Sequence, residues 1–353
     1  MNPYKNANSR QFWSRAVSWE AWGRVDPVSK SFLIESDSPV STMGSCFAQH
    51  ISRQIAKSGC HYFISEPPPS GMDDEQAKRH SYGVFSARYG NVYTVRQALQ
   101  LFKEAFGAFS PSLLYWRSGA GVIDPYRPNI QPEPFSDVRE LTKSRELHLS
   151  CVRKIFSESG VFVLTLGLTE GWQFRQDGAA IPLAPGVTGD SCSLEDYKFV
   201  NYSFNEIRSD LFELLSEISK INRTCKFILT VSPVPLIATY ENQHVVTANT
   251  YSKSLLRVAA QEAENFMGNV FYFPSYEIIT CAASQGAYFE NDFRQVSPLG
   301  VNHVMRVFKS NFILEKKQKN TEEFTAFTAS RSTEESSVVC DEETIERSLR
   351  ALD

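Results

Sequence analysis

The stretch Pro39-Val40-Ser41-Thr42-Met43-Gly44-Ser45-Cys46-Phe47-Ala48 decides the fold of this chain. Residues 39–43 form a short run of the kind that is typical of a strand buried on both faces. A helical pattern follows at once over residues 47–57. The turn formed by Gly44, Ser45 and Cys46 is therefore expected at the carboxyl end of a strand, where parallel α/β sheets bind their ligands.

The rest of the chain repeats this alternation of strand and helix. Further strands are predicted over 161–166 (VFVLTL), 226–231 (KFILTV) and 269–273 (NVFYF), with a weaker fifth strand over 61–64 (HYFI). Apolar residues at helical spacing predict helices over 94–106, 137–156, 204–221, 252–266 and 298–312. Such alternation is typical of a doubly wound α/β sheet. No break in composition divides residues 1–315, which we expect to form one domain.

The sequence changes character after about Lys316. Residues 316–353 are polar and charged, and they lack the periodicity of a packed element except for a short helical pattern at the end. Segments of this composition bury too little apolar surface to offset the entropy lost on ordering. We therefore expect residues 316–353 to be a disordered C-terminal tail.

Charge and cysteine usage narrow the class of protein. The 353 residues carry a formal net charge of −4, which argues against a nucleic-acid partner. The first residues lack the apolar core of a signal peptide and no run is long enough to span a bilayer, so we expect a cytoplasmic protein without a membrane partner.

Seven cysteines without CxxC spacing predict reduced thiols and no zinc site. No phosphate-loop or EF-hand pattern occurs, so we expect neither a metal nor a cofactor.

Two side chains in the 44–46 turn are candidate nucleophiles. A helix N-terminus lowers the pKa of a thiol and stabilises an oxyanion. Cys46 is the better intrinsic nucleophile at neutral pH, whereas Ser45 needs an adjacent base. The alternative is structural, with Cys46 packed in the core and Ser45 capping the helix. The local pattern leaves both interpretations open.

Several long strings resemble one protein family. GSCFA at 44–48 is the motif that names the GSCFA family, whose members are related to the SGNH (GDSL-type) hydrolases. The likeness continues in SARYGNVYTVRQ (86–97), LTLGLTEGW (164–172), TVSPVPLIATY (230–240), TYSKSLLR (250–257) and YFPSYEI (272–278). The resemblance implies a flavodoxin-like, three-layer α/β/α fold with a mostly parallel central sheet of about five strands. It also implies an acyl hydrolase or acyltransferase site.

The same resemblance implies a register for the site. In the SGNH pattern the nucleophile is third in a Gly-Asp-Ser turn, so Gly44-Ser45-Cys46 puts Cys46 in the nucleophile's place and would make the intermediate a thioester. Gly90-Asn91 corresponds to the second block, which contributes to the oxyanion hole. Arg88, just before this block, is a candidate for binding an anionic or sugar substrate.

A third block of the oxyanion hole corresponds to residues 167–170. This block begins at Gly167 and ends at Glu170, and Thr169 stands where the SGNH pattern has asparagine. A threonine hydroxyl can donate one hydrogen bond to an oxyanion, so this substitution is tolerable.

The expected general base is missing from its usual place. SGNH hydrolases carry Asp-x-x-His before the last helix, and the corresponding positions here are Asp292 and Gln295. Glutamine cannot accept a proton at neutral pH. Three alternatives stay open: His303 in the final helix, His50 one helical turn after Cys46, or a thiolate stabilised by the helix dipole together with Arg88 or Arg294.

These features predict an esterase, deacylase or acyltransferase that acts through a covalent acyl-enzyme. In this hypothesis Cys46 is the nucleophile, while Gly90, Asn91 and Thr169 hold the oxyanion. Asp292 orients the base or is itself the remaining base.

The substrate class expected from the resemblance is a small molecule or glycan, namely an acylated carbohydrate or related metabolite. Gln295 motivates the alternative of a catalytically degenerate protein that binds a carbohydrate or acyl ligand without turnover. The sequence does not determine the oligomeric state.

Overall fold

The computed structural model describes residues 2–190, 193–314 and 340–350. Its centre is a parallel sheet with the strand order β1-β4-β8-β9. The four strands are β1 (Val40–Gly44), β4 (Val161–Leu166), β8 (Lys226–Val231) and β9 (Val270–Tyr272). Gly44 pairs with Thr165, and Thr165 pairs with Thr230, so the carboxyl ends of three strands meet at one edge.

The predicted fifth strand is reduced to a single bridge. Tyr62 bridges to Val40 in the parallel sense, which places this segment beyond β1. The ladder stops there because the next N–H on this edge of β1, that of Thr42, donates to the Ser86 hydroxyl instead. The segment order is nevertheless 2-1-3-4-5, the order of flavodoxin-like sheets. The predicted strand count is thus corrected from about five to four.

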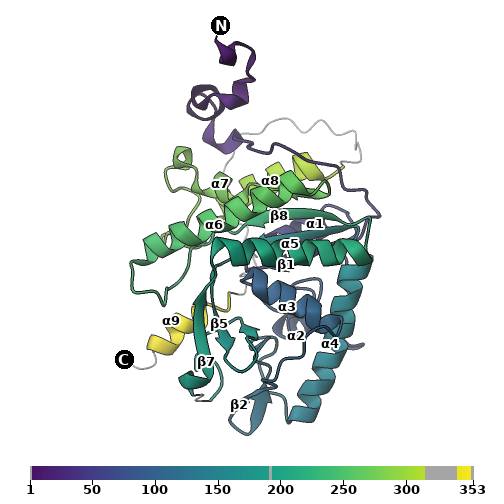
Figure 1. Ribbon diagram of the computed structural model, residues 1–353. Helices are drawn as coiled ribbons and strands as arrows, with labels where there is room; N and C mark the ends of the chain where they lie inside the picture. The colour runs from purple at the N-terminus through teal and green to yellow at the C-terminus, as the bar shows by residue number, and fades with distance from the viewer. Residues whose placement is uncertain (1, 191–192, 315–339, 351–353) are drawn as a thin grey trace.

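Helices cover both faces of the sheet and make a three-layer α/β/α fold (Figure 1). One core cluster joins one sheet face to four helices, and the second cluster joins the other face to three helices. The first group is α3 (Val95–Ala105), α4 (Val138–Glu158), α5 (Phe204–Ile221) and α6 (Val245–Phe266). The second group is α1 (Ala48–Lys57), α7 (Ser275–Thr280) and α8 (Pro298–Phe312).

Local capping explains where several helices begin. Ser297 accepts a hydrogen bond from the Gly300 N–H, and Pro298 follows at the first helical position, as predicted for α8. Ser203 and Glu206 form a reciprocal capping box at the start of α5. Helix α6 begins earlier than the predicted residue 252, because His244 caps the Val246 N–H.

Smaller elements decorate the sheet. They are α2 (Asp74–Arg79), the antiparallel pair β2 (Trp116–Ser118) and β3 (Gly121–Ile123), and a small sheet of β6 (Ala180–Ile181), β5 (Glu170–Phe174) and β7 (Tyr197–Asn201). The N-terminal residues form short turns of 3-10 or π helix that project from the body in Figure 1. Among the helices that the structure describes, none has both the length and the apolar composition needed to cross a bilayer.

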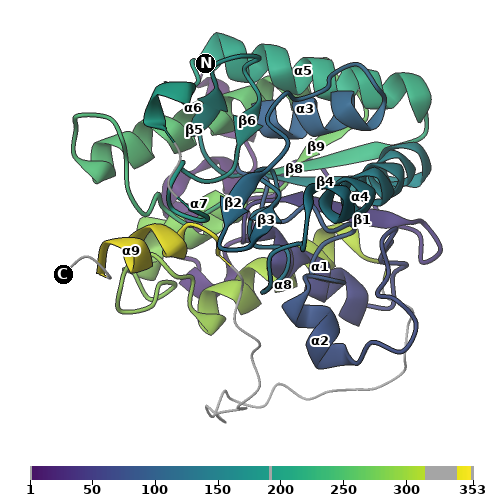
Figure 2. The same cartoon turned by 90° about the horizontal axis from the view of Figure 1, so that it is seen from below.

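The end of the chain differs in part from the predicted disorder. Cys340, Asp341 and Glu342 pack against the body, and α9 (Glu343–Arg350) follows them. Helix α9 is the yellow helix on the side of the molecule away from α4 in both views (Figures 1 and 2). The order comes from polar contacts of three side chains, which a test for apolar periodicity does not detect. The remaining residues of the predicted tail, 316–339 and 351–353, lie outside the described residues.

Candidate active site

The turn after β1 brings the backbone unusually close to β4. Gly44 has φ of 140°, and a Cβ at this position would lie 2.3 Å from the Thr165 carbonyl oxygen. Only glycine fits this approach without moving a strand. The Gln49 N–H donates to the Cys46 carbonyl, so Cys46 stands in the turn that opens α1.

This close approach predicts a large effect on stability. We expect Gly44→Ala to lower the free energy of unfolding by about 3 kcal/mol, because the Cβ must displace the backbone of β4 and adopt positive φ. The matched control is Gly59→Ala, since Gly59 also has positive φ but no atom lies within 4 Å of its added Cβ. Its expected loss is about 1 kcal/mol from backbone strain alone. Urea denaturation followed by circular dichroism measures both, and equal losses would contradict the steric argument.

Cys46 and Ser45 face different surroundings. Cys46 lines an open cleft of about 920 Å³. Both residues are 4% exposed, but Ser45 does not line this cleft, and its hydroxyl has no hydrogen-bond partner among the described residues. Ser45 instead packs against Gly167, where an added Cβ would lie 3.1 Å from the Ser45 Cβ. The geometry favours Cys46 as the residue that can meet a ligand.

Backbone hydrogen bonds bring the three motif blocks together. The Val92 N–H donates to the Gly44 carbonyl at 2.9 Å. The N–H groups of Gly167 and Leu168 both donate to the Tyr93 carbonyl, at 3.2 and 2.9 Å. The turn after β1, the segment around Gly90 and the end of β4 therefore form one cluster at the carboxyl edge of the sheet.

The third block does not offer its side chains to the cleft. The Thr169 hydroxyl donates to the Asn201 side-chain carbonyl at 2.7 Å, so its proton is already engaged. Glu170 accepts a hydrogen bond from the Thr239 hydroxyl at 2.7 Å, and burial raises the pKa of its carboxyl. This arrangement argues against an oxyanion role for Thr169 and gives Glu170 a structural role in holding the loop after β8.

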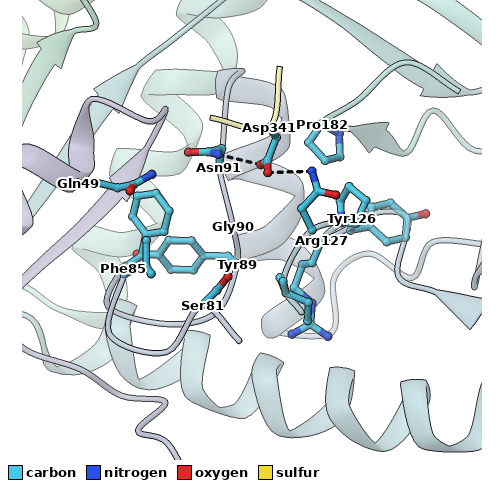
Figure 3. A pocket seen from close by; sticks show the side chains of 14 residues that line it. Gln49, Ser81, Phe85, Tyr89, Gly90, Asn91, Tyr126, Arg127, Pro182 and Asp341 are labelled. Atoms are coloured by element: carbon cyan, nitrogen blue, oxygen red, sulfur yellow. Dashed lines mark hydrogen bonds between the residues drawn. The ribbon is translucent and has the colours of Figure 1, made fainter. Parts of the chain in front are cut away.

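Asn91 carries the polar contacts of the second block. Its side-chain N–H₂ donates to the Asp341 carboxylate at 2.8 Å, and the Asn129 side chain donates to the other carboxylate oxygen at 3.0 Å. Figure 3 shows Asp341 between these two dashed contacts, with Gly90 close by. The backbone N–H of Asn91 also interacts with this carboxylate. Asn91 thus belongs to an anion cradle next to the nucleophile turn.

Arg88 turns away from the cleft. Its guanidinium donates to the backbone carbonyls of His80 and Ile130, and it lies 4.0 Å from Glu66. The side chain is buried, which lowers the pKa of the guanidinium. Arg88 therefore has a structural role in the packing beneath the second block, and the geometry argues against its contact with a substrate.

His303 has no free ring nitrogen. Its Nδ1 bonds to the Tyr288 hydroxyl at 2.5 Å and its Nε2 bonds to the Val25 carbonyl at 2.9 Å. The contact with Val25 holds the N-terminal segment against α8. The geometry therefore argues against His303 as the base, because a ring that is engaged at both nitrogens cannot accept the proton of Cys46.

His50 lines the same cleft as Cys46. Burial and the nearby Arg53 lower the pKa of its imidazole to about 4, so the ring is neutral at pH 7. Its ring packs against Phe47, with centroids 5.4 Å apart. His50 stays a candidate by position, although such a low pKa makes it a weak base.

Asp292 and Gln295 form a local turn. The Asp292 carboxylate accepts hydrogen bonds from the N–H groups of Arg294 and Gln295, both at 3.0 Å. Gln295 lines the cleft, whereas Asp292 is exposed and is not among the lining residues. The role of Asp292 here is to shape the loop that presents Arg294.

Lys253 is a site residue that the sequence motifs did not single out. It is almost fully buried, and its ammonium donates to the Gly167 carbonyl at 2.8 Å. Burial lowers the pKa of Lys253 to about 8, although the negative charge of Glu342 acts in the opposite direction. The sequence does contain a signal for Lys253. This lysine lies on the same helix face as the buried Leu256 and Ala260, where a charged residue is unexpected.

The thiol of Cys46 meets a second thiol. Cys46 donates a hydrogen bond to Cys340, and this contact together with burial raises the pKa of Cys46 well above its usual range. The same contact lowers the pKa of Cys340, whose sulfur lies 3.7 Å from the Arg294 guanidinium. In this state Cys46 is a protonated thiol. Within the described parts of the chain, no group of three or more His, Cys, Asp or Glu side chains could hold a metal ion.

Comparison with known proteins identifies a family and a similar solved structure. The profile of the GSCFA family matches residues 39–308. A crystal structure described as a "putative GDSL-like lipase" from Parabacteroides merdae ATCC 43184 is similar at 14% sequence identity, over 80% of this chain and 98% of that chain, with a TM-score of 0.33. No curated protein matches the chain.

Proposed function

The chain belongs to the GSCFA family, and on this premise we propose that it is an acyl hydrolase or acyltransferase with Cys46 as its nucleophile. One observation carries the proposal. Cys46 lies at the carboxyl end of β1, in the turn that opens α1, and it lines a large open cleft beside a buried lysine of lowered pKa. A nucleophile in a cleft with a perturbed titratable neighbour is the arrangement that covalent catalysis requires.

In the proposed reaction, Lys253 takes the role that histidine has in the SGNH pattern. A pKa of about 8 gives Lys253 a neutral amine fraction near neutral pH, which can accept the thiol proton of Cys46. The Cys46 thiolate then attacks the acyl carbonyl carbon. Lys253 returns the proton to the leaving oxygen or sulfur as that bond breaks. The resulting thioester transfers its acyl group to water or to an acceptor hydroxyl.

The developing oxyanion needs N–H donors at the end of β1. Asn91 supports this role, because its side-chain amide and backbone N–H already hold the carboxylate of Asp341. A carboxylate oxygen and a tetrahedral oxyanion make similar demands on such donors. The substrate class we propose is an acylated carbohydrate or related small molecule, which rests on the family resemblance.

The acyl-enzyme itself provides the test. After brief incubation with p-nitrophenyl acetate and an acid quench, we expect peptide mapping to place the acetyl group on Cys46. Hydroxylamine at neutral pH should remove it, because this reagent cleaves thioesters much faster than oxygen esters. An adduct that resists hydroxylamine and maps to Ser45 would contradict the assignment.

A second candidate function is ligand binding without turnover. It is favoured by Gln295, which stands where the SGNH base is expected, and by the raised pKa of the Cys46 thiol. This candidate predicts that acyl esters are not hydrolysed and that ligand affinity survives Cys46→Ala. Turnover that is lost in Cys46→Ala would reject it.

A further inference from the structure

The cleft over Cys46 holds a segment of the chain's own C-terminal region. Cys340 meets the Cys46 thiol, and Asp341 and Glu342 follow it into the site. Helix α9 then leads the chain out along the cleft, where Thr344 and Arg347 form part of the lining. Three consecutive side chains thus approach the proposed nucleophile from a region far away in the sequence.

The Asp341 carboxylate occupies a built site. It is only 6% exposed, and its oxygens lie 2.8 Å and 3.0 Å from the side-chain amides of Asn91 and Asn129. The Asn91 backbone N–H completes the cradle. A buried carboxylate is costly unless its lone pairs are satisfied, and three N–H donors do this here.

The Glu342 carboxylate occupies a second site. One of its oxygens lies 2.9 Å from the Arg294 guanidinium, and the side chains of this pair are 10% and 14% exposed. The Lys253 ammonium adds a second positive charge that attracts the same carboxylate. Removing Glu342 would leave these two cations facing each other with their common counter-charge gone.

The rest of the cleft carries an excess of positive charge, which complements the two carboxylates. Outside residues 340–347, its lining includes four basic residues and one acidic residue: Arg53, Lys57, Arg79 and Arg294 against Glu290. The chain as a whole is acidic, with a net charge of −4, so this excess of positive charge is local. A cleft of one sign attracts ligands of the opposite sign.

We propose that the cleft over Cys46 recognises an acidic acyl compound whose carboxylate binds where Glu342 lies, and that Cys340, Asp341 and Glu342 occupy the cleft as an intramolecular analogue of that ligand. In this analogue the Asp341 carboxylate takes the place of the oxyanion beside Asn91. The carboxylate positions come from the contacts above. The identity of the ligand as an acyl substrate rests on the proposed function. It narrows the proposed substrate class to its acidic members.

Occupation by the segment also lowers the reactivity of Cys46. The Cys46 thiol donates a hydrogen bond to the Cys340 sulfur, and this raises the pKa of Cys46. When the segment leaves, this hydrogen bond and the negative charge of Glu342 are lost, whereas Arg294 and Lys253 remain. Both cations favour the thiolate, so an open cleft has the more reactive Cys46.

The test measures access to Cys46 in the full-length protein. The probe is iodoacetamide, and peptide mapping follows the rate of modification at Cys46. We expect Asp341→Asn combined with Glu342→Gln to speed this modification at least about tenfold. The reason is that both substitutions remove a carboxylate charge that holds the segment in the cleft. Each single substitution should give a smaller increase. The matched control is Glu346→Gln, because Glu346 is an exposed acidic residue on α9 that does not line the cleft. Its rate should equal that of the unmodified sequence.

A peptide added to the double variant tests the ligand class. The peptide CDEETIERSLR (residues 340–350) should slow the modification of Cys46, whereas the same peptide with Asn and Gln at 341 and 342 should protect at least about tenfold less well. Unchanged access in a double variant with a native circular dichroism spectrum would overturn the proposal. Equal protection by both peptides would overturn it as well.

The two proposals fail in different ways. Suppose that iodoacetamide modifies Cys46 quickly in the double variant, but that the variant hydrolyses no acyl ester, acidic or neutral. This result would reject the proposed function and leave the carboxylate sites supported. A double variant that hydrolyses acyl esters while its Cys46 reacts no faster than in the unmodified sequence would reject the intramolecular analogue and leave the hydrolase supported.

Discussion

Replacing Cys46 with alanine is expected to lower the turnover of an activated acyl ester by about a thousandfold or more, because the covalent intermediate can no longer form. The residual rate should equal that of uncatalysed hydrolysis in the same buffer. Steady-state release of p-nitrophenol measures both rates. The fold should persist, since the substitution removes only the sulfur atom of a residue that lines the cleft.

Two variants serve as controls for this prediction. Ser45→Ala should change turnover by less than about threefold, because the Ser45 hydroxyl is buried and has no hydrogen-bond partner among the described residues. Cys46→Ser keeps the size of the side chain but supplies a much weaker nucleophile, so it should retain only a small fraction of the activity. If Ser45→Ala abolished turnover and Cys46→Ala did not, the nucleophile would be Ser45.

Replacing Lys253 with methionine should have opposite effects on activity and stability. We expect kcat/KM to fall about a hundredfold, since a positioned base contributes roughly this much. The dependence of kcat/KM on pH should also change. In the unmodified sequence the rate rises with pH as Lys253 loses its proton near its pKa of about 8, and this rise should be absent in Lys253→Met.

The same substitution should stabilise the fold at neutral pH. The pKa of Lys253 falls from 10.5 to about 8 on folding, which corresponds to a cost of about 3 kcal/mol for burying the ammonium. Methionine removes this cost but loses the hydrogen bond to the Gly167 carbonyl, which offsets about 1–2 kcal/mol. The net expectation is a gain of about 1–2 kcal/mol in the free energy of unfolding.

The pH dependence of stability separates this account from a purely structural one. Because the folded pKa is the lower one, the unfolded chain binds more protons between about pH 8 and pH 10.5, so the free energy of unfolding should rise with pH over this window. Lys253→Met should lack this contribution. Lys220→Met is the control, because Lys220 is exposed on α5 and pairs with Glu217. A loss of activity without the pH effects would contradict the role of Lys253 as base.

Local signals in the sequence located the framework of the site. The apolar runs of β1, β4 and β8 are buried along nearly their whole length, so their boundaries followed from composition alone. Gly44 marked the turn because no other residue fits against the Thr165 backbone. In a parallel sheet, strand order then brings the turn after β1 and the end of β4 to the same edge. For these features the determining contacts lie within a few residues or within one ladder.

Only the tertiary structure decided which side chains act together at that edge. The contact between Asn91 and Asp341 joins residues 250 positions apart, and nothing in either local pattern predicts it. Thr169 matched the expected block, yet its hydroxyl bonds to Asn201, a partner supplied by another strand. Polar and charged contacts, not apolar ones, hold residues 340–342 in place. Their sequence therefore shows no apolar periodicity, and taken alone it predicts disorder. Secondary structure follows from periodic local preferences, whereas the pairing of buried charges depends on which distant segments the fold brings together.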